Sequence, residues 1–134
     1  MTDFAPVSDL AGMLAGMAPV LDAQSYRFVV PGPPQEFAAL HERVFALVYE
    51  DEGLTCIVRA SPKDEGRPFA RITLMVHSAL DGVGLTAAVA TALAEAGIAC
   101  NVVAGFHHDH LFVPWERRDD ALAILSDLSA RTDG

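Results

Sequence analysis

The sequence predicts an α+β protein with a ferredoxin-like fold, made of two halves with antiparallel sheets and helices on one face. The second half, residues 69–134, follows the order β-α-β-β-α, which is a ferredoxin-like order without its last strand. The first half, residues 1–68, supplies three candidate strands, and no long polar stretch separates the halves. We therefore expect the two halves to interlock, with a strand from the first completing the sheet of the second.

The clearest periodic signal is a helix in the second half. Apolar residues recur at spacings of three and four from Leu85 to Ala96, which places them along one side of a helix. Gly97 follows and can adopt the left-handed conformation that often ends a helix. The opposite face is small, with Glu95 as its single charge, so we expect a second packing partner there.

Strand patterns flank this helix. Residues 71–77 alternate between two kinds of side chain, as a strand with two different faces does. Residues 98–105 and 110–113 are rich in Val and Ile, and the polar segment 106–109 between them is typical of a hairpin turn. A last helix is predicted after Asp119.

The first half gives weaker signals. A short helix is predicted from Leu10 to Met17, capped by Ser8 and ended before Pro19. Residues 26–30 form a strand candidate. The rest of the first half predicts a stiff turn at residues 31–34, a hairpin of residues 44–49 and 54–58 around an acidic turn, and a helical turn that starts at Ser61.

Composition excludes several classes of protein. Hydrophobic residues make up 51% of the 134, so the chain can bury a core and is not globally disordered. The net charge of −9 disfavours binding to nucleic acid or to an anionic membrane. The sequence has neither a membrane-spanning apolar run nor a signal peptide, so we expect a cytoplasmic protein. Cys56 and Cys100 lie in apolar runs and are expected to be buried, reduced thiols.

The segment HSALDGVGLTAAVATALAEAGIACNVVAGFHHDHLFVP, residues 77–114, resembles the core of the small bacterial ACT-domain proteins that carry two ACT-like modules in tandem. The resemblance covers nearly the whole chain and is strongest at residues 81–86 and at Asp109-His110-x-x-Val113-Pro114. The second half is also similar to the ACT modules of the eukaryotic cytosolic arginine sensor, whose hairpin has a similar Asp-His followed by Val-Pro.

The resemblance implies a regulatory module without catalytic activity or cofactor, which binds a small ligand, usually an amino acid, at an interface between ACT units. It also implies a homodimer. The ligand would lie at the first β-α loop and the facing strand ends. The ligand-binding residues predicted in this way are Ser78, Asp81, Gly82, Val83, Gly84, Leu85, Thr86, Asn101, Gly105, Phe106 and Asp109.

The loop from Ser78 to Gly84 opens a helix, so its backbone N–H groups and the helix dipole can hold a carboxylate. The alternative is a tight turn in which Asp81 or Ser78 caps the helix. Neither a P-loop nor a dinucleotide-binding fingerprint is present, so nucleotide binding is disfavoured.

Residues 107–110, His-His-Asp-His, offer two further interpretations. Zinc is one, because imidazole and carboxylate are its usual ligands, but alternation along an extended chain puts at most two ligands on each face. We therefore predict no metal site and a polar turn. The ACT resemblance implies a further role, in which Asp109 pairs with a ligand's ammonium group or a cationic side chain. Asn101, on an otherwise apolar strand, is expected to be a buried polar group that needs a partner.

Catalysis has little support in the sequence. His77 precedes Ser78 directly, and neighbours on a strand face opposite ways, which prevents a nucleophile–base pair. No GxSxG elbow is present. The alternatives to a ligand-binding module are a protein-interaction module with an empty site and, less favoured, a metal-dependent hydrolase.

Overall fold

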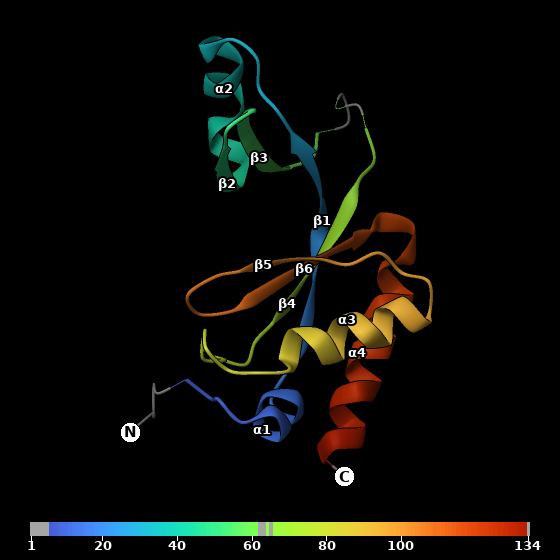
Figure 1. Ribbon diagram of the computed structural model, residues 1–134. Coiled ribbons are helices and arrows are strands. Elements are labelled where there is room, and N and C mark those ends of the chain that lie inside the picture. Colours follow the sequence, from blue (N-terminus) through green and yellow to red (C-terminus); the bar gives the residue numbers. More distant parts are fainter. Residues whose placement is uncertain (1–5, 62–63, 65, 134) are drawn as a thin grey trace. The chain divides into compact units, whose positions relative to one another are not determined.

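The computed structural model describes residues 6–61, 64 and 66–133 (Figure 1). The chain forms two compact units: unit 1 comprises residues 1–22 and 70–134, and unit 2 comprises residues 23–69. Strand β1, Pro19–Val29, begins in unit 1 and continues in unit 2. Among the described residues, no helix is both long and apolar enough to cross a membrane.

Unit 1 combines a sheet with three α-helices. Its elements besides β1 are α1 (Leu10–Ala15), β4 (Phe69–Leu74), α3 (Leu85–Glu95), β5 (Asn101–Ala104), β6 (Asp109–Pro114), the short 3-10 helix η2 (Trp115–Arg117) and α4 (Arg118–Asp133). The strand order is β1-β4-β6-β5. The first residues of β1 therefore occupy the place of the missing ferredoxin-like strand, beside β4, which confirms that a strand of the first half completes this sheet.

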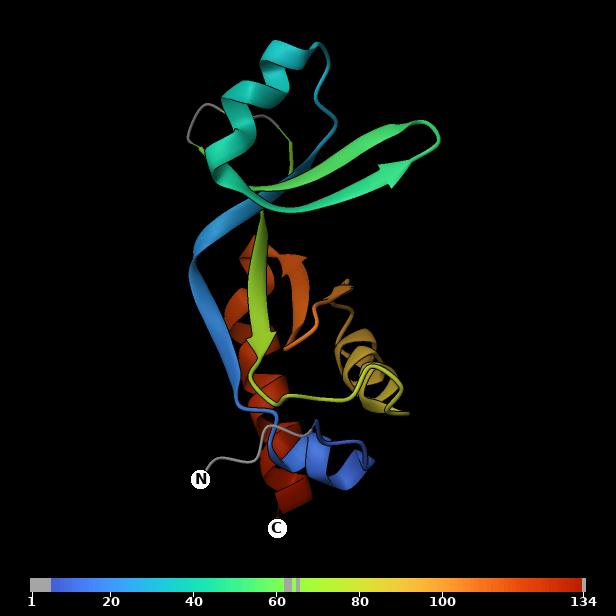
Figure 2. The ribbon, with the colours of Figure 1, turned by 90° about the vertical axis from the view of Figure 1, so that its left-hand side faces the viewer.

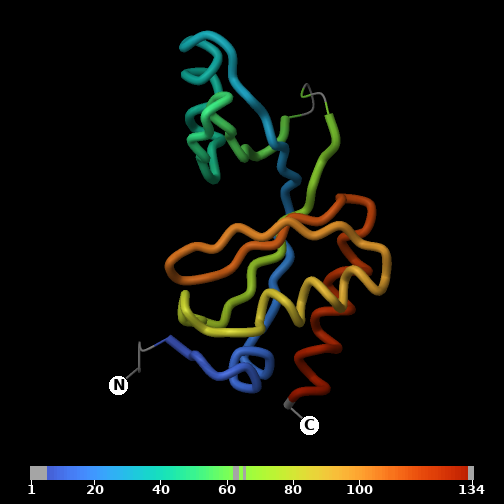
Figure 3. The backbone as a smooth tube through the Cα atoms, in the orientation of Figure 1, coloured from blue at the N-terminus to red at the C-terminus, as the bar shows by residue number. Residues whose placement is uncertain are grey.

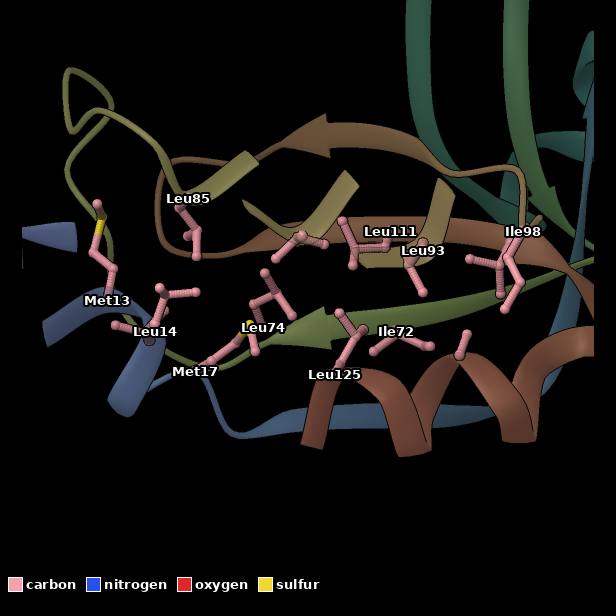
Figure 4. Packing of buried hydrophobic residues seen from close by; sticks show 14 of the residues in the cluster. Met13, Leu14, Met17, Ile72, Leu74, Leu85, Leu93, Ile98, Leu111 and Leu125 are labelled. Carbon is pink, nitrogen blue, oxygen red and sulfur yellow. The ribbon is translucent and has the colours of Figure 1, made fainter. Parts of the chain in front are cut away.

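One face of this sheet packs against all three helices (Figure 4). Alternate residues of β4, such as Ile72 and Leu74, are buried there, as are Leu93 of α3 and Leu125 of α4. The predicted stripe of α3 is thus confirmed, because buried positions recur along the helix at the expected spacing. The helices of unit 1 lie on one face, as the sequence predicts.

Helix α1 differs from its prediction at both ends. Its cap is Asp9 and not Ser8: an oxygen of the Asp9 carboxylate accepts a hydrogen bond from the Gly12 N–H at 2.8 Å. The helix ends at Ala15, well before Pro19, which instead begins β1. A proline is tolerated there because the first residue of a strand need not donate to the ladder. The Ser129 hydroxyl donates to the Ala15 carbonyl at 3.2 Å and joins α4 to α1.

The strands around α3 have different bounds from those predicted, and β6, Asp109–Pro114, is longer than the predicted 110–113. β4 ends at Leu74, after which the Met75 N–H donates to the Met17 carbonyl at 2.8 Å, so the backbone leaves the sheet for the N-terminal segment. β5 begins only at Asn101, because the Ile98 N–H donates to the Leu93 carbonyl at 2.9 Å and extends the end of α3.

Unit 2 contains the rest of β1 and the elements α2 (Pro34–Leu40), the 3-10 helix η1 (His41–Arg43), β2 (Val44–Glu50) and β3 (Gly53–Arg59). Its strand order is β2-β3-β1. The β2–β3 hairpin confirms the prediction, and Figure 2 shows its two green strands joined at the turn.

Two features of the first half of the chain were not predicted. Helix α2 starts at Pro34, within the segment interpreted as a stiff turn, and proline suits the first turn of a helix. β1 starts seven residues before its predicted beginning at Tyr26. The helical turn predicted from Ser61 falls mainly on residues 62, 63 and 65, outside the described residues.

Candidate functional site

A cavity of about 90 Å³ lies in unit 1 where three segments meet: helix α1, the β4–α3 loop and the β5–β6 hairpin. Figure 3 shows the yellow loop after β4 running close to the orange hairpin and to α1. The lining residues are Met13, Ser78, Ala79, Leu80, Gly82, Leu85, Thr86, Ala104 and Asp109. The volume is well below the roughly 300–1,000 Å³ of pockets that hold drug-sized molecules, so only a small ligand fits.

The β4–α3 loop is held in place by the chain that precedes α1. The Val7 N–H donates to the His77 carbonyl, and the Ala79 N–H donates to the Val7 carbonyl, both at 2.8 Å. These two bonds form a parallel bridge on either side of Ser78. The Gly82 N–H then closes a turn on the Ala79 carbonyl at 3.0 Å. The loop that lines the cavity is therefore fixed by backbone hydrogen bonds.

Helix α3 starts at the cavity. Its N-cap is Gly84, at a φ of 104°, and no side chain caps the helix. The alternative in which Asp81 or Ser78 caps α3 is therefore wrong, because the left-handed glycine makes the turn and its neighbours' side chains do not reach the helix end. Leu85 and Thr86, the first residues of the helix, line the cavity, where the partial positive charge of a helix N-terminus favours an anion.

A carboxylate lies opposite this helix end. Asp109 is the first residue of β6 and pairs with Ala104 across the hairpin. The Ser78 hydroxyl donates to Asp109 Oδ2 at 3.3 Å, which connects the hairpin rim to the loop. Among the lining residues, Asp109 is the one that carries a charge. The cavity thus has a negative group on one side and a positive helix end on another.

The structure brings five of the predicted residues to this cavity: Ser78, Gly82, Leu85, Thr86 and Asp109. The other six, Asp81, Val83, Gly84, Asn101, Gly105 and Phe106, are not among its lining residues. Val83 and Phe106 are strongly exposed.

The prediction that Asn101 is a buried polar group is wrong. The residue is exposed, not buried, because it lies on β5, at the edge of the sheet, opposite Phe112 and at the other end of the hairpin from Asp109. Its amide approaches the Phe112 carbonyl at 3.5 Å.

Sequence reasoning missed Met13, Ala79, Leu80 and Ala104 as lining residues. Ala79 and Leu80 belong to the loop already singled out, and Ala104 follows from its pairing with Asp109 across the turn. Met13 gave a signal only as a member of the apolar stripe of α1. No local pattern connects that helix to a loop more than sixty residues later, as it does in the structure.

The histidine side chains of the β4–α3 loop and the β5–β6 hairpin do not gather in one place. The ring of His107 lies 5.6 Å from that of His77 and 5.1 Å from that of Phe106, measured between centroids. His110 instead bonds through Nδ1 to the Thr73 hydroxyl at 2.9 Å. Partial burial lowers the pKa of His110. Within the described part of the chain, no three His, Cys, Asp or Glu side chains form a group that could hold a metal ion.

Comparison with known families and structures agrees with this fold. Two ACT-domain family models match the chain, one at residues 5–65 and one at residues 70–127. No functionally curated protein matches it.

Among solved structures, a Vibrio cholerae protein of unknown function, named as a possible transport protein, is 40% identical, with a TM-score of 0.76 over 90% of this chain and 95% of that one. The regulatory subunit of aspartate kinase from Thermus thermophilus shares the fold at 15% identity, with a TM-score of 0.60 over 84% of this chain and 97% of that one. An Agrobacterium tumefaciens protein does so at 22% identity, with a TM-score of 0.62 over 79% of this chain and 84% of that one. The chain belongs to the ACT-domain proteins and carries two ACT modules in tandem.

Proposed function

We propose that this protein is a regulatory module that binds a free amino acid in the cavity of unit 1 and catalyses no reaction. ACT domains are regulatory modules that often bind amino acids. The observation that carries the proposal is the meeting of Asp109, Ser78 and the N-terminus of α3 at one small cavity. These groups match the two charges of an α-amino acid.

The ligand's carboxylate belongs at the start of α3. Backbone N–H groups and the helix dipole stabilise an anion there, and the lining residues include no lysine or arginine that would compete for it. The ligand's ammonium group belongs at Asp109, where a charge-assisted hydrogen bond forms. The Ser78 hydroxyl donates to the carboxylate of Asp109 and keeps that side chain turned towards the loop.

The first experiment is a thermal-stabilisation screen of the intact protein with each of the common amino acids. A ligand that binds only the native state raises the unfolding midpoint, by an amount equivalent to about 2.7 kcal/mol when it is present at 100 times its Kd. We expect at least one amino acid to raise the midpoint. If none does, the protein-interaction module with an empty site is the better description.

The second experiment is calorimetry of the identified amino acid with Asp109→Asn. Asparagine keeps the size of the side chain but removes the charge, so we expect affinity to fall about tenfold to a hundredfold, which corresponds to about 1.5–3 kcal/mol. Asp81→Asn is the matched control, because Asp81 is an exposed carboxylate of the β4–α3 loop that does not line the cavity. Equal affinities for Asp109→Asn and Asp81→Asn would contradict the assignment of Asp109.

A second groove, separate from the cavity, supports the further proposal that the protein forms a homodimer. The groove measures about 510 Å³ and lies on α3 between α1 and α4, where Ala87, Ala88, Thr91 and Ala92 line it. Its lining is mostly apolar but includes Glu95 and Arg131, which pairs with Asp127 of its own helix at 3.0 Å; a mostly apolar patch of this kind suits a second copy related by two-fold symmetry. Sedimentation of Ala92→Glu, within the groove, and of Ala94→Glu, outside it, tests this: only the first should dissociate the dimer. A monomeric wild-type protein would exclude it.

A further inference from the structure

One wall of the cavity comes from helix α1 through a single side chain, Met13, which is 1% exposed. The methionine lies directly on the loop: a β-carbon added to Gly82 would be 3.1 Å from Met13 Sδ and 3.3 Å from its Cε. Contacts this short leave no space for an atom between the thioether and the loop backbone. The side chain therefore closes the cavity on this side.

The backbone that carries Met13 is fixed at both ends of α1. Asp9 caps its N-terminus, and Val7 is bonded to the loop itself on either side of Ser78. At the C-terminal end, the Ala15 carbonyl accepts the hydroxyl of Ser129 from α4. The helix cannot move away from the loop without breaking the bonds of Val7 or that of Ser129, so a ligand meets Met13 in place.

The other walls leave little additional space. Leu85 is 4% exposed and forms part of the core, and Ala104 faces the cavity with a short side chain from β5. When the ligand's two charged groups are held by Asp109 and the start of α3, its side chain must fit in what remains of about 90 Å³. The apolar side chains of the lining are those of Met13, Ala79, Leu80, Leu85 and Ala104; Met13 and Leu85 form its buried part, whereas Leu80 is 68% exposed.

We infer that Met13 sets the upper size limit of the ligand, so that the site takes α-amino acids with short uncharged side chains, such as glycine, alanine and serine. This inference rests on the proposed function and narrows it to a class of ligand. It also assigns a specificity role to α1, which lies in the region matched by the first ACT model, at a cavity whose other walls belong to the second.

The test compares the affinities of the intact protein for alanine and leucine, measured by calorimetry. The wild type should bind alanine at least about tenfold more tightly than leucine, because the larger side chain overlaps Met13. Met13→Ala opens that wall and should reduce the ratio of alanine affinity to leucine affinity about tenfold, so that the preference for alanine is lost or reversed. Met17→Ala is the matched control, because Met17 is equally buried in the same core but does not line the cavity. The ratio of alanine affinity to leucine affinity of this variant should equal that of the wild type.

The outcomes separate this inference from the proposed function. If the wild type binds no amino acid, the proposed function fails and this inference fails with it. If the wild type binds leucine as tightly as alanine, or if Met13→Ala leaves the ratio at its wild-type value, the function stands and the role of Met13 is refuted.

A second variant keeps the test independent of the stability of Met13→Ala. Ala104 is exposed on an edge strand, where a β-branched residue is well tolerated, so Ala104→Val should fold normally. It adds bulk to the wall that β5 contributes and should weaken alanine binding more than glycine binding. An alanine-to-glycine affinity ratio equal to that of the wild type would show that the cavity does not limit the ligand's size.

Discussion

The side chain of Leu10 covers the backbone of Gly84. A β-carbon added to this glycine would lie 3.1 Å from Leu10 Cδ2 and 3.2 Å from its Cδ1. Together with the contact between Met13 and Gly82, this means that α1 packs directly on both glycines of the loop. The glycines therefore allow a helix to approach the loop closely, in addition to making its turn.

Gly84→Val should consequently destabilise the fold. Valine disfavours a φ of 104° and would also overlap Leu10, and overpacking of this kind costs about 1–3 kcal/mol. Gly97→Val is the control, because Gly97 also has a positive φ, of 72°, but an added β-carbon there meets no atom within 4 Å. Urea denaturation should show a larger loss for Gly84→Val, and equal losses would mean that Leu10 simply moves aside.

Leu93→Ala tests the phase of helix α3. Leu93 is fully buried between the sheet and α4, so its truncation should lower the free energy of unfolding by about 2–5 kcal/mol. Leu80→Ala, at a position 68% exposed, should change it by no more than about 0.5 kcal/mol. A denaturation midpoint for Leu93→Ala equal to that of the wild type would remove this residue from the core.

His110 makes stability depend on pH. Its folded-state pKa is below the ordinary value of about 6.5, mainly through desolvation and further through the positive charge of Arg71 and the neighbouring His108. The unfolded chain therefore binds a proton more readily than the folded one. The stability that His110 contributes is complete above about pH 6.5 and is lost as the pH falls through the lower folded-state pKa.

We expect His110→Gln to reduce this acid sensitivity, because glutamine can still bond to the Thr73 hydroxyl but does not titrate in this range. Denaturation midpoints of the wild type and the variant between about pH 7.5 and 5 provide the measurement. His107→Gln, at an exposed ring, serves as the control. Identical pH profiles for wild type and His110→Gln would refute the prediction.

Ser78→Ala should weaken binding of the identified amino acid without a large change in stability. The variant removes the hydroxyl that donates to Asp109, a single hydrogen bond of about 0.5–1.5 kcal/mol, so affinity should fall about twofold to tenfold. The effect should be smaller than that of Asp109→Asn, which removes the charge itself. A larger effect for Ser78→Ala would indicate that the hydroxyl, and not the carboxylate, contacts the ligand.

The sequence predicts α3 and the β2–β3 hairpin well because their signals are local: a period of three to four residues in one, and two apolar runs around an acidic turn in the other. Helix α2 lacks such a signal, since it has seven residues and none of them is buried. The beginning of β1 was missed because Pro19 is read from sequence as the end of a helix. Its position is instead decided by pairing with β4, far along the chain.

The same distinction applies to the site. The β4–α3 loop and Asp109 could be predicted because glycines before a helix and an acid at a hairpin are recognisable in one short segment. The role of Met13 depends on tertiary packing of α1 on that loop, and the exposure of Asn101 depends on which strand lies at the sheet edge. Neither follows from local sequence.

Strand β1 has a consequence for how this protein can be divided. The match of one ACT model to residues 70–127 invites expression of that segment alone, but such a fragment would lack the first residues of β1, which lie beside β4. β4 would then present a row of unpaired N–H and C=O groups, the kind of surface that recruits strands from other molecules. The fragment should aggregate or exchange strands between copies, so we expect stable folding only when residues 70–127 are expressed together with the segment that carries β1.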